Sequence, residues 1–190
     1  MIGVSLADPV KRLLYLVGIP GSGKTTLMAA ALAGVPSLGE ASKPFAHVVY
    51  PRGCQLGRLR SKFSGTDALS LSVQPRVLEW LAGPCPYINI VGEGDRLGNH
   101  SFFSGVQNLG WELTVVYLDT PESVALERCA ARGSNQDKAW WRGRVTKVHN
   151  LVNAWPCLRM DGTNPLDVLA SQLGTFPMIQ ALAGTHSKKA

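Results

Sequence analysis

Residues 18–26 have the types and the order of a loop that holds phosphate. They read Gly-Ile-Pro-Gly-Ser-Gly-Lys-Thr-Thr, which fills every position of the pattern GxxxxGK[ST], and they directly follow the apolar run 13–17. Glycines allow a turn tight enough for several backbone N–H groups to point at one anion, and the Ala- and Leu-rich segment 25–33 predicts a helix whose positive end faces that anion. The alternative is a glycine-rich turn that binds no nucleotide.

Two side chains of this loop are predicted to act on a nucleoside triphosphate. Lys24 would bridge the β- and γ-phosphates, and the Thr25 hydroxyl would ligate Mg²⁺. Asp161 and Gly162 follow the last predicted strand, where a loop would cover the adenine of ATP, although their composition suits any strand-to-helix turn. ATP and Mg²⁺ are therefore the expected cofactors. The other predicted nucleotide contacts are Gly18, Pro20, Gly21, Ser22, Gly23 and Thr26.

Three acidic residues are candidates for holding the metal and for moving a proton. Glu93 follows the last apolar residue of the predicted strand 87–91 by two positions, where a carboxylate holds Mg²⁺ beside a phosphate loop. Asp67 is the predicted base for an acceptor hydroxyl, the alternative being a carboxylate that stabilises a helix N-terminus. Asp95 could take either role or form a surface ion pair with Arg96. The sequence leaves open which of the three is the base.

Positive charge gathers in two stretches of a chain whose net charge is +6. Segment 51–65 lacks periodicity and is expected to be a basic binding loop. The polar turn 133–136 is expected to belong to a short mobile lid, about residues 133–145, that brings arginines onto the transferring phosphoryl group; a solvated charged helix is the alternative. Arg128 and Arg132 are assigned to catalysis. The predicted substrate contacts are Arg58, Arg60, Lys62, Phe63, Ser64, Asp67, Arg142 and Arg144.

Basic clusters of this kind suit nucleic acid, but an enzyme that handles ATP also needs arginines around its phosphates. Phe63 could stack on a base or fill the core. Of the neighbouring Trp140 and Trp141, one ring is expected to pack on the sheet and the other to contact a nucleobase.

Strand-like and helix-like segments alternate along the chain, which predicts an α/β fold of three layers with a five-stranded parallel sheet and helices on both faces. The length of 190 residues suits one domain, with loosely held ends at 1–10 and 183–190. No apolar run approaches the roughly 20 residues of a membrane span, and no secretory segment is evident, so we expect a cytoplasmic protein without a membrane partner. The oligomeric state is left open. The predicted strands are residues 13–18, 46–50, 87–91, 113–119 and 156–160.

The order of these features resembles the nucleoside-monophosphate-kinase-like branch of P-loop kinases over about residues 12–175. The resemblance rests on the phosphate loop, the acidic strand end at Glu93, the strand 115–119 that leads through Pro121 into the helix of Arg128 and Arg132, and the loop 161–162. It implies the P-loop kinase fold with an Arg-rich lid. The Asp-Arg-Tyr/Phe signature of thymidylate kinases is absent.

Within this branch, segments 63–70 and 132–136 are similar to the bacteriophage kinases that phosphorylate 5-hydroxymethyldeoxyuridine in DNA. That resemblance implies transfer of the γ-phosphate of ATP to the hydroxyl of 5-hydroxymethyluracil in DNA, in the cytoplasm of the host cell. Two other functions compete with it. A kinase for a free nucleotide or small metabolite shares the ATP chemistry but needs no DNA groove, and a nucleotide-binding switch or ATPase subunit needs no acceptor at all.

Overall fold

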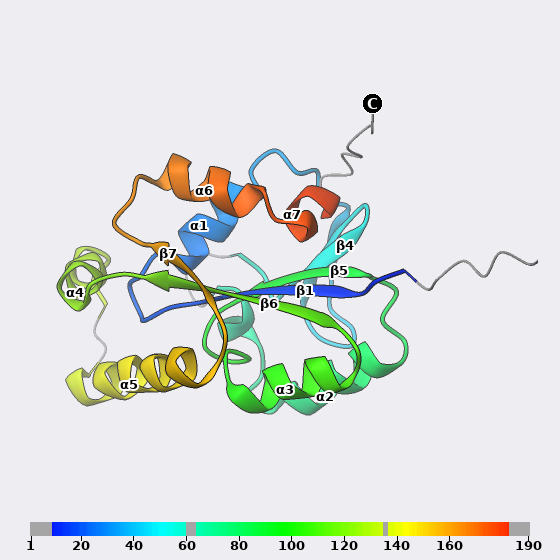
Figure 1. Ribbon diagram of the computed structural model, residues 1–190, viewed down its shortest axis with the longest axis horizontal. Coiled ribbons are helices and arrows are strands. Elements are labelled where there is room, and N and C mark those ends of the chain that lie inside the picture. Colours follow the sequence, from blue (N-terminus) through cyan, green and yellow to red (C-terminus); the bar gives the residue numbers. More distant parts are fainter. Residues whose placement is uncertain (1–8, 60–63, 135–136, 183–190) are drawn as a thin grey trace, which may run out of the picture.

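A computed structural model describes residues 9–59, 64–134 and 137–182, and it arranges them around one sheet in the order β2-β3-β4-β5-β1-β6-β7 (Figure 1). The strands are β1 (Arg12–Val17), β2 (Gly39–Ala41), β3 (His47–Tyr50), β4 (Gly53–Leu56), β5 (Asn89–Glu93), β6 (Glu112–Asp119) and β7 (Leu158–Asp161). The helices are α1 (Lys24–Ala31), the 3₁₀ helix η1 (Thr66–Ala68), α2 (Val73–Ala82), α3 (His100–Asn108), α4 (Glu122–Ala131), α5 (Lys138–Ala154), α6 (Leu166–Gly174) and α7 (Pro177–Leu182).

Helices cover both faces of the sheet. Helices α1, α6 and α7 lie above it in Figure 1 and α2, α3 and α5 lie below it, while α4 lies at the end toward which β6 runs. The five strands β4-β5-β1-β6-β7 are all parallel. The predicted three-layer α/β fold is therefore confirmed. Within the described ranges, no helix has the length and apolar character needed to cross a membrane.

Strand β1 lies in the middle of this arrangement and is covered on both faces. Leu13, Tyr15 and Val17 belong to the core on the side of α2, α3 and α5, whereas Leu14 and Leu16 belong to the core on the side of α1, α6 and α7. A continuous apolar run is typical of a parallel strand between two helical layers. Packing on both faces fixes the end of β1, where the glycine-rich loop begins.

The sheet has seven strands, two more than predicted, because residues 39–56 add a hairpin-like extension. The predicted strand 46–50 is β3, which pairs antiparallel with β2 and with β4. Strand β4 lies inside segment 51–65, which we expected to be a loop, and it is the parallel neighbour of β5. Tyr50 pairs with Gly53, so a turn of only two residues separates two strands where the sequence pattern indicated one.

Some predicted features fall on residues outside the described ranges. These are most of the two loosely held ends, the basic-loop residues Arg60, Lys62 and Phe63, and Asn135 and Gln136 of the predicted lid.

Tyr15 connects the central strand β1 to η1 and to the residues that follow β5. Its ring is fully buried and meets the rings of Phe102 and Phe103 edge-on. Its hydroxyl lies 2.7 Å from Thr66 Oγ1 and donates to the carbonyl of Gly94 at 3.0 Å. Thr66 in turn donates from Oγ1 to the carbonyl oxygen of Glu93 at 2.9 Å. One tyrosine thus joins β1, η1 and the end of β5.

We predict that Tyr15→Phe lowers the free energy of unfolding by about 1–3 kcal/mol, because a buried carbonyl loses its donor while the ring still fills its space. The matched control is Tyr50→Phe, whose hydroxyl makes a single long bond of 3.5 Å to Gln55 and should cost less. Urea titration measures both. Equal losses in the two variants would show that the Tyr15 hydroxyl does not support this junction.

Candidate active site

The loop 18–26 joins β1 to α1 and is shaped by glycines in backbone conformations that favour glycine. Gly21 has φ +84° and Gly23 has φ +100°, which L side chains rarely adopt. A β-carbon on Gly21 would lie 2.2 Å from the carbonyl oxygen of Ala125 in α4. The loop is therefore held in the form of a cradle by its own backbone and by the helix that packs against it.

The side chains of this cradle suit an anion. The hydroxyl of Ser22 is buried and has no hydrogen-bond partner within the described part of the chain. The ammonium of Lys24 lies back across the loop and donates to the carbonyls of Gly18 at 2.7 Å and Ile19 at 3.0 Å. A phosphate group in the loop would give Ser22 an acceptor and would attract Lys24 away from these carbonyls, so the residues present fit the predicted ligand.

Glu93 lies at the end of β5 and faces this loop. Its side chain is 1% exposed, and Thr25 Oγ1 donates to its Oε1 at 3.0 Å. Burial raises the pKa of Glu93, while the charge of Lys24 and the bond from Thr25 lower it. Burial likewise lowers the pKa of Lys24, and the charge of Glu93 raises it. The structure thus brings together the two predicted Mg²⁺ ligands, Thr25 and Glu93.

Glu93 is also tightly packed against residues 64–70, the segment that contains Asp67 and that we call the acceptor segment. A β-carbon on Gly65, whose φ is +58°, would lie 2.1 Å from Glu93 Oε1. The chain can approach the carboxyl this closely only because residue 65 has no side chain. Gly65 therefore belongs to the site, although its position in a polar stretch gave no sign of this contact.

Asp67 holds the turn that follows Glu93. Its Oδ1 accepts the backbone N–H groups of Asp95 at 2.7 Å and of Arg96 at 2.9 Å. The Arg96 guanidinium donates to the carbonyl of Asp67 at 3.3 Å. Asp67 therefore holds the residues that closely follow Glu93, and one of its oxygens already anchors the backbone.

Asp95 is engaged by two cations of α5. It forms an ion pair with Arg144, and Lys147 Nζ lies 2.8 Å from both its Oδ1 and its carbonyl oxygen. Arg144, predicted to contact substrate, thus contacts the end of β5. Lys147 was not among the predicted site residues; its spacing of three from Arg144 on a helix was the signal that places both on one face.

Arg58 of the basic segment 51–65 was predicted to contact substrate, and in the structure its side chain contacts other residues of the chain. Its guanidinium pairs with Glu40 in β2, with Nε 2.8 Å from the carboxylate, and donates to Ser42 at 3.1 Å. The carbonyl of Arg58 accepts the hydroxyl of Ser64 at 3.3 Å and the N–H of Gly65 at 2.8 Å. Arg58 and Ser64 thus shape the segment that leads to Gly65.

The arginines of α4 and α5 occupy different surroundings. Arg132, at the end of α4, is exposed and donates to Cys129 Sγ at 3.5 Å, and its charge lowers the pKa of Lys24. Arg142 is exposed on α5.

Residues 138–145 of the predicted lid form the first half of α5, whose Trp141 lies in the core. Asn135 and Gln136 of the lid lie outside the described residues.

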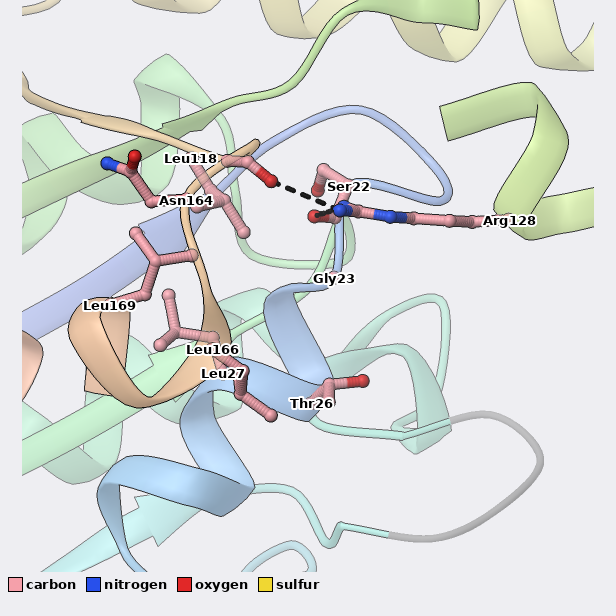
Figure 2. Close-up of a pocket in the computed structure, with 10 residues that line it drawn as sticks. Ser22, Gly23, Thr26, Leu27, Leu118, Arg128, Asn164, Leu166 and Leu169 are labelled. Carbon is pink, nitrogen blue, oxygen red and sulfur yellow. Dashed lines mark hydrogen bonds between the residues drawn. The ribbon is translucent and has the colours of Figure 1, made fainter. Parts of the chain in front are cut away.

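A cavity of about 240 Å³ opens beside the phosphate loop, on the side of α1 and α6 (Figure 2). Arg128 spans one wall, since Nη1 donates to the carbonyl of Ser22 at 3.0 Å and Nη2 to the carbonyl of Gly162 at 3.2 Å. Asn164 follows in the same loop. The lining residues are Ser22, Gly23, Thr26, Leu27, Leu118, Arg128, Gly162, Asn164, Leu166 and Leu169.

This cavity combines predicted and unpredicted residues. Ser22, Gly23, Thr26 and Gly162 were predicted nucleotide contacts, whereas Arg128 was predicted to act in catalysis. Asp161, also a predicted nucleotide contact, is exposed, and its Oδ1 accepts the N–H and hydroxyl of Thr163, which lowers its pKa. Asp161 therefore shapes the turn that carries Gly162 and does not line the cavity. The leucines of the cavity were missed because their spacing is the same as that of ordinary core residues.

The comparison with protein families assigns the chain to a kinase family. The model of the P-loop Nucleotide Kinase3 family matches residues 9–172. The chain belongs to this family. No curated protein matches the kinase. A structure of the APS kinase CysC from Mycobacterium tuberculosis, in complex with AMPPNP and APS, has a TM-score of 0.50 and 15% identity to it, over 87% of this chain and 96% of that chain. This likeness confirms the P-loop kinase fold.

An unliganded crystal structure of a sugar kinase from Janibacter sp. HTCC2649 is also similar. It has a TM-score of 0.49 and 14% identity, over 94% of this kinase and all of that chain.

Because burial raises the pKa of Glu93, its stabilising contribution is complete below its ordinary pKa of 4.5 and declines as the pH rises through its pKa in the folded chain. We therefore predict that Glu93→Gln, in nucleotide-free and metal-free buffer, melts a few degrees above wild type at pH 7–8 and together with it near pH 4. Differential scanning calorimetry across this range measures the effect. The control is Glu112→Gln, an exposed carboxylate paired with Arg12, which should leave the melting temperature almost unchanged. A lower melting temperature for Glu93→Gln at neutral pH would contradict the prediction.

Proposed function

We propose that this kinase transfers the γ-phosphate of ATP to the hydroxyl of 5-hydroxymethyluracil bases in DNA. The observation that carries the phosphotransfer is the contact between Thr25 and Glu93, 3.0 Å apart beside a complete phosphate loop. Two oxygen ligands are what a protein commonly offers Mg²⁺, which takes its other ligands from water and from the substrate's phosphates. When bound there, Mg²⁺ would neutralise charge on the β- and γ-phosphates.

On the donor side, each group of the chain has a distinct task. The backbone of residues 18–26 holds the β-phosphate, and Lys24 extends to the γ-phosphate. The apolar cavity beside Thr26 and Asn164 takes the nucleoside. Arg128, by holding the carbonyls of Ser22 and Gly162, keeps the phosphate loop and the cavity wall at a fixed separation.

On the acceptor side, the contacts narrow the choice of base. Asp95 already pairs with Arg144 and Lys147, so both of its carboxylate oxygens are engaged by cations of α5. Glu93 faces Thr25 and supports the metal. We assign the role of base to Asp67. Its Oδ1 is fixed by two backbone N–H groups, and its second oxygen orients the acceptor hydroxyl.

The DNA acceptor is supported by the similarity of segments 63–70 and 132–136 to the phage DNA kinases and by the cations of α5. One contact favours the second candidate, a kinase for a free nucleotide or small metabolite. Arg58 pairs with Glu40 inside the chain, and an arginine held in this way contributes less to a DNA backbone. Arg144 and Lys147 are likewise held, by Asp95, so in the DNA proposal the phosphate contacts come mainly from Lys138 and Arg142 of α5. The enzyme then works in the cytoplasm of an infected host.

Two substitutions separate the base from the backbone anchor at position 67. Asn keeps an oxygen that can accept the N–H groups of Asp95 and Arg96 but loses the charge, whereas Ala loses both. If Asp67 is the base, both variants should lower kcat by about 10²–10⁴ with little change in the affinity for ATP. Steady-state kinetics and melting temperatures test this. Near-normal turnover in Asp67→Asn with a large loss in Asp67→Ala would leave only the anchoring role.

The acceptor is identified with γ-labelled ATP and a panel of substrates. We expect label on DNA that contains 5-hydroxymethyluracil and none on DNA with thymine, because thymine has no hydroxyl on its 5-methyl group. The panel also includes DNA with 5-hydroxymethylcytosine and the free nucleosides and nucleotides. Lys24→Ala is the control and should lose transfer by about 10²-fold or more, because it removes the ammonium proposed to reach the γ-phosphate. Its melting temperature is measured alongside, since the charge of Lys24 also acts on the buried Glu93. Better transfer to a free nucleoside or nucleotide than to DNA would establish the second candidate instead.

A further inference from the structure

The first turns of α5 carry an aromatic ring and two cations on one face. Trp140, Arg144 and Lys147 are spaced four and three residues apart, which places them side by side on a helix. The next face along the helix carries Trp141, Val145 and Val148, which are buried in the core. Of the two adjacent tryptophans, Trp141 is therefore the one that packs on the sheet, and Trp140 is 40% exposed.

The exposed ring contacts a cation and belongs to a helical turn whose backbone is capped. Asp137 caps α5, and its carboxylate accepts the backbone N–H of Trp140 at 3.3 Å. The guanidinium of Arg144 lies 5.3 Å from the centroid of the ring, a cation–π contact. Arg144 is itself paired with Asp95. An exposed side chain that is fixed in this way loses little entropy when a ligand packs on it.

The same contacts attach the ring to the acceptor side of the site. Asp95 receives Arg144 and Lys147 through its side chain, and its backbone N–H bonds to Asp67 at 2.7 Å. A chain of contacts thus runs from Trp140 through Arg144 and Asp95 to the proposed base. None of these residues lines the cavity on the opposite side of the phosphate loop, so this ring is not part of the nucleoside cavity.

Gly143 leaves the flank of this ring uncovered. It lies three residues after Trp140, inside a helix, where glycine is less favourable than any residue except proline. A β-carbon there would meet no atom within 4 Å, so neither packing nor backbone conformation requires a glycine. A longer side chain at this position would lie along the face that carries Trp140 and Arg144.

We propose that Trp140 is a stacking platform for the nucleobase of the acceptor, with the cations of α5 holding the phosphates on either side of that base. This inference rests on the proposed function and names its acceptor-binding residue. A nucleobase is the occupant that matches the charge: Arg144 and Lys147 lie on the same face as the ring, Lys138 and Arg142 add two more cations to the first turns of α5, and Asp137 and Asp95 are the acidic residues described beside them. Aromatic stacking combined with a basic surface is how proteins bind bases that are outside a duplex.

The kinetic test compares Trp140→Ala, Trp140→Phe and Gly143→Gln with Leu126→Ala, a control on α4 that removes a side chain 47% exposed. Trp140→Ala should raise KM for the acceptor by about fivefold to a hundredfold, while KM for ATP and kcat stay within twofold. Phe should restore most of the affinity because it keeps a ring. Gly143→Gln should raise KM for the acceptor without lowering the melting temperature. Unchanged acceptor KM in Trp140→Ala and in Gly143→Gln, both folded, would overturn the proposal.

A binding measurement separates this proposal from the choice of acceptor, because it needs no phosphotransfer. Fluorescence titration of the wild type uses a single-stranded thymidine oligonucleotide, an abasic oligonucleotide of equal length and free thymidine monophosphate. Tighter binding of the thymidine oligonucleotide than of the abasic one, with quenching that disappears in Trp140→Phe, supports stacking even if no DNA is phosphorylated. Quenching by the mononucleotide alone supports stacking and refutes the DNA acceptor. Equal binding of the two oligonucleotides together with no quenching by the mononucleotide would overturn the proposal.

Discussion

The site depends on one carboxylate that is kept out of water. Glu93 is 1% exposed at the end of a central strand, and an ionised group in such a place requires partners. Thr25 supplies a hydrogen bond, Lys24 supplies a positive charge, and Gly65 supplies room through the lack of a side chain. These partners come from two segments, the phosphate loop and the segment of Gly65, so the buried carboxylate links the two.

The same strand end also organises the groups beyond the metal position. The carbonyl of Glu93 accepts Thr66, the carbonyl of Gly94 accepts Tyr15, and the N–H of Asp95 bonds to Asp67. Glu93 and Asp95 therefore hold η1 through their main-chain groups, and Gly94 holds Tyr15 of β1 in the same way. Each bond joins a side chain to the main chain at the end of β5, and the base proposed at Asp67 gains from the rigidity that these bonds give.

The parts of the site that the sequence predicted are those that local patterns determine. The phosphate loop lies within nine consecutive residues, and Glu93 follows an apolar strand, so the order of residues brings out both. The partner of Arg58 could not be predicted, because Glu40 belongs to a strand of three residues with no apolar alternation. Strand β4 was missed for a similar reason: its buried Gln55 and the two-residue turn before it hide the pattern of a core strand. The different surroundings of Trp140 and Trp141 needed the orientation of α5, which the order of residues alone does not give.

The two halves of the proposed reaction lie on opposite faces of the sheet. The cavity with Leu27, Leu118 and Leu169 belongs to the layer of α1 and α6, whereas the ion pairs of Asp95 reach down to α5 in the other layer (Figure 1). The phosphate loop and the end of β5 lie between them, at the carboxyl ends of the parallel strands. The leaving ADP and the attacking hydroxyl would then lie on opposite sides of the γ-phosphate, which is the arrangement that in-line displacement requires. The topology itself provides this separation, because a parallel strand covered on both faces presents its carboxyl end to both helical layers at once.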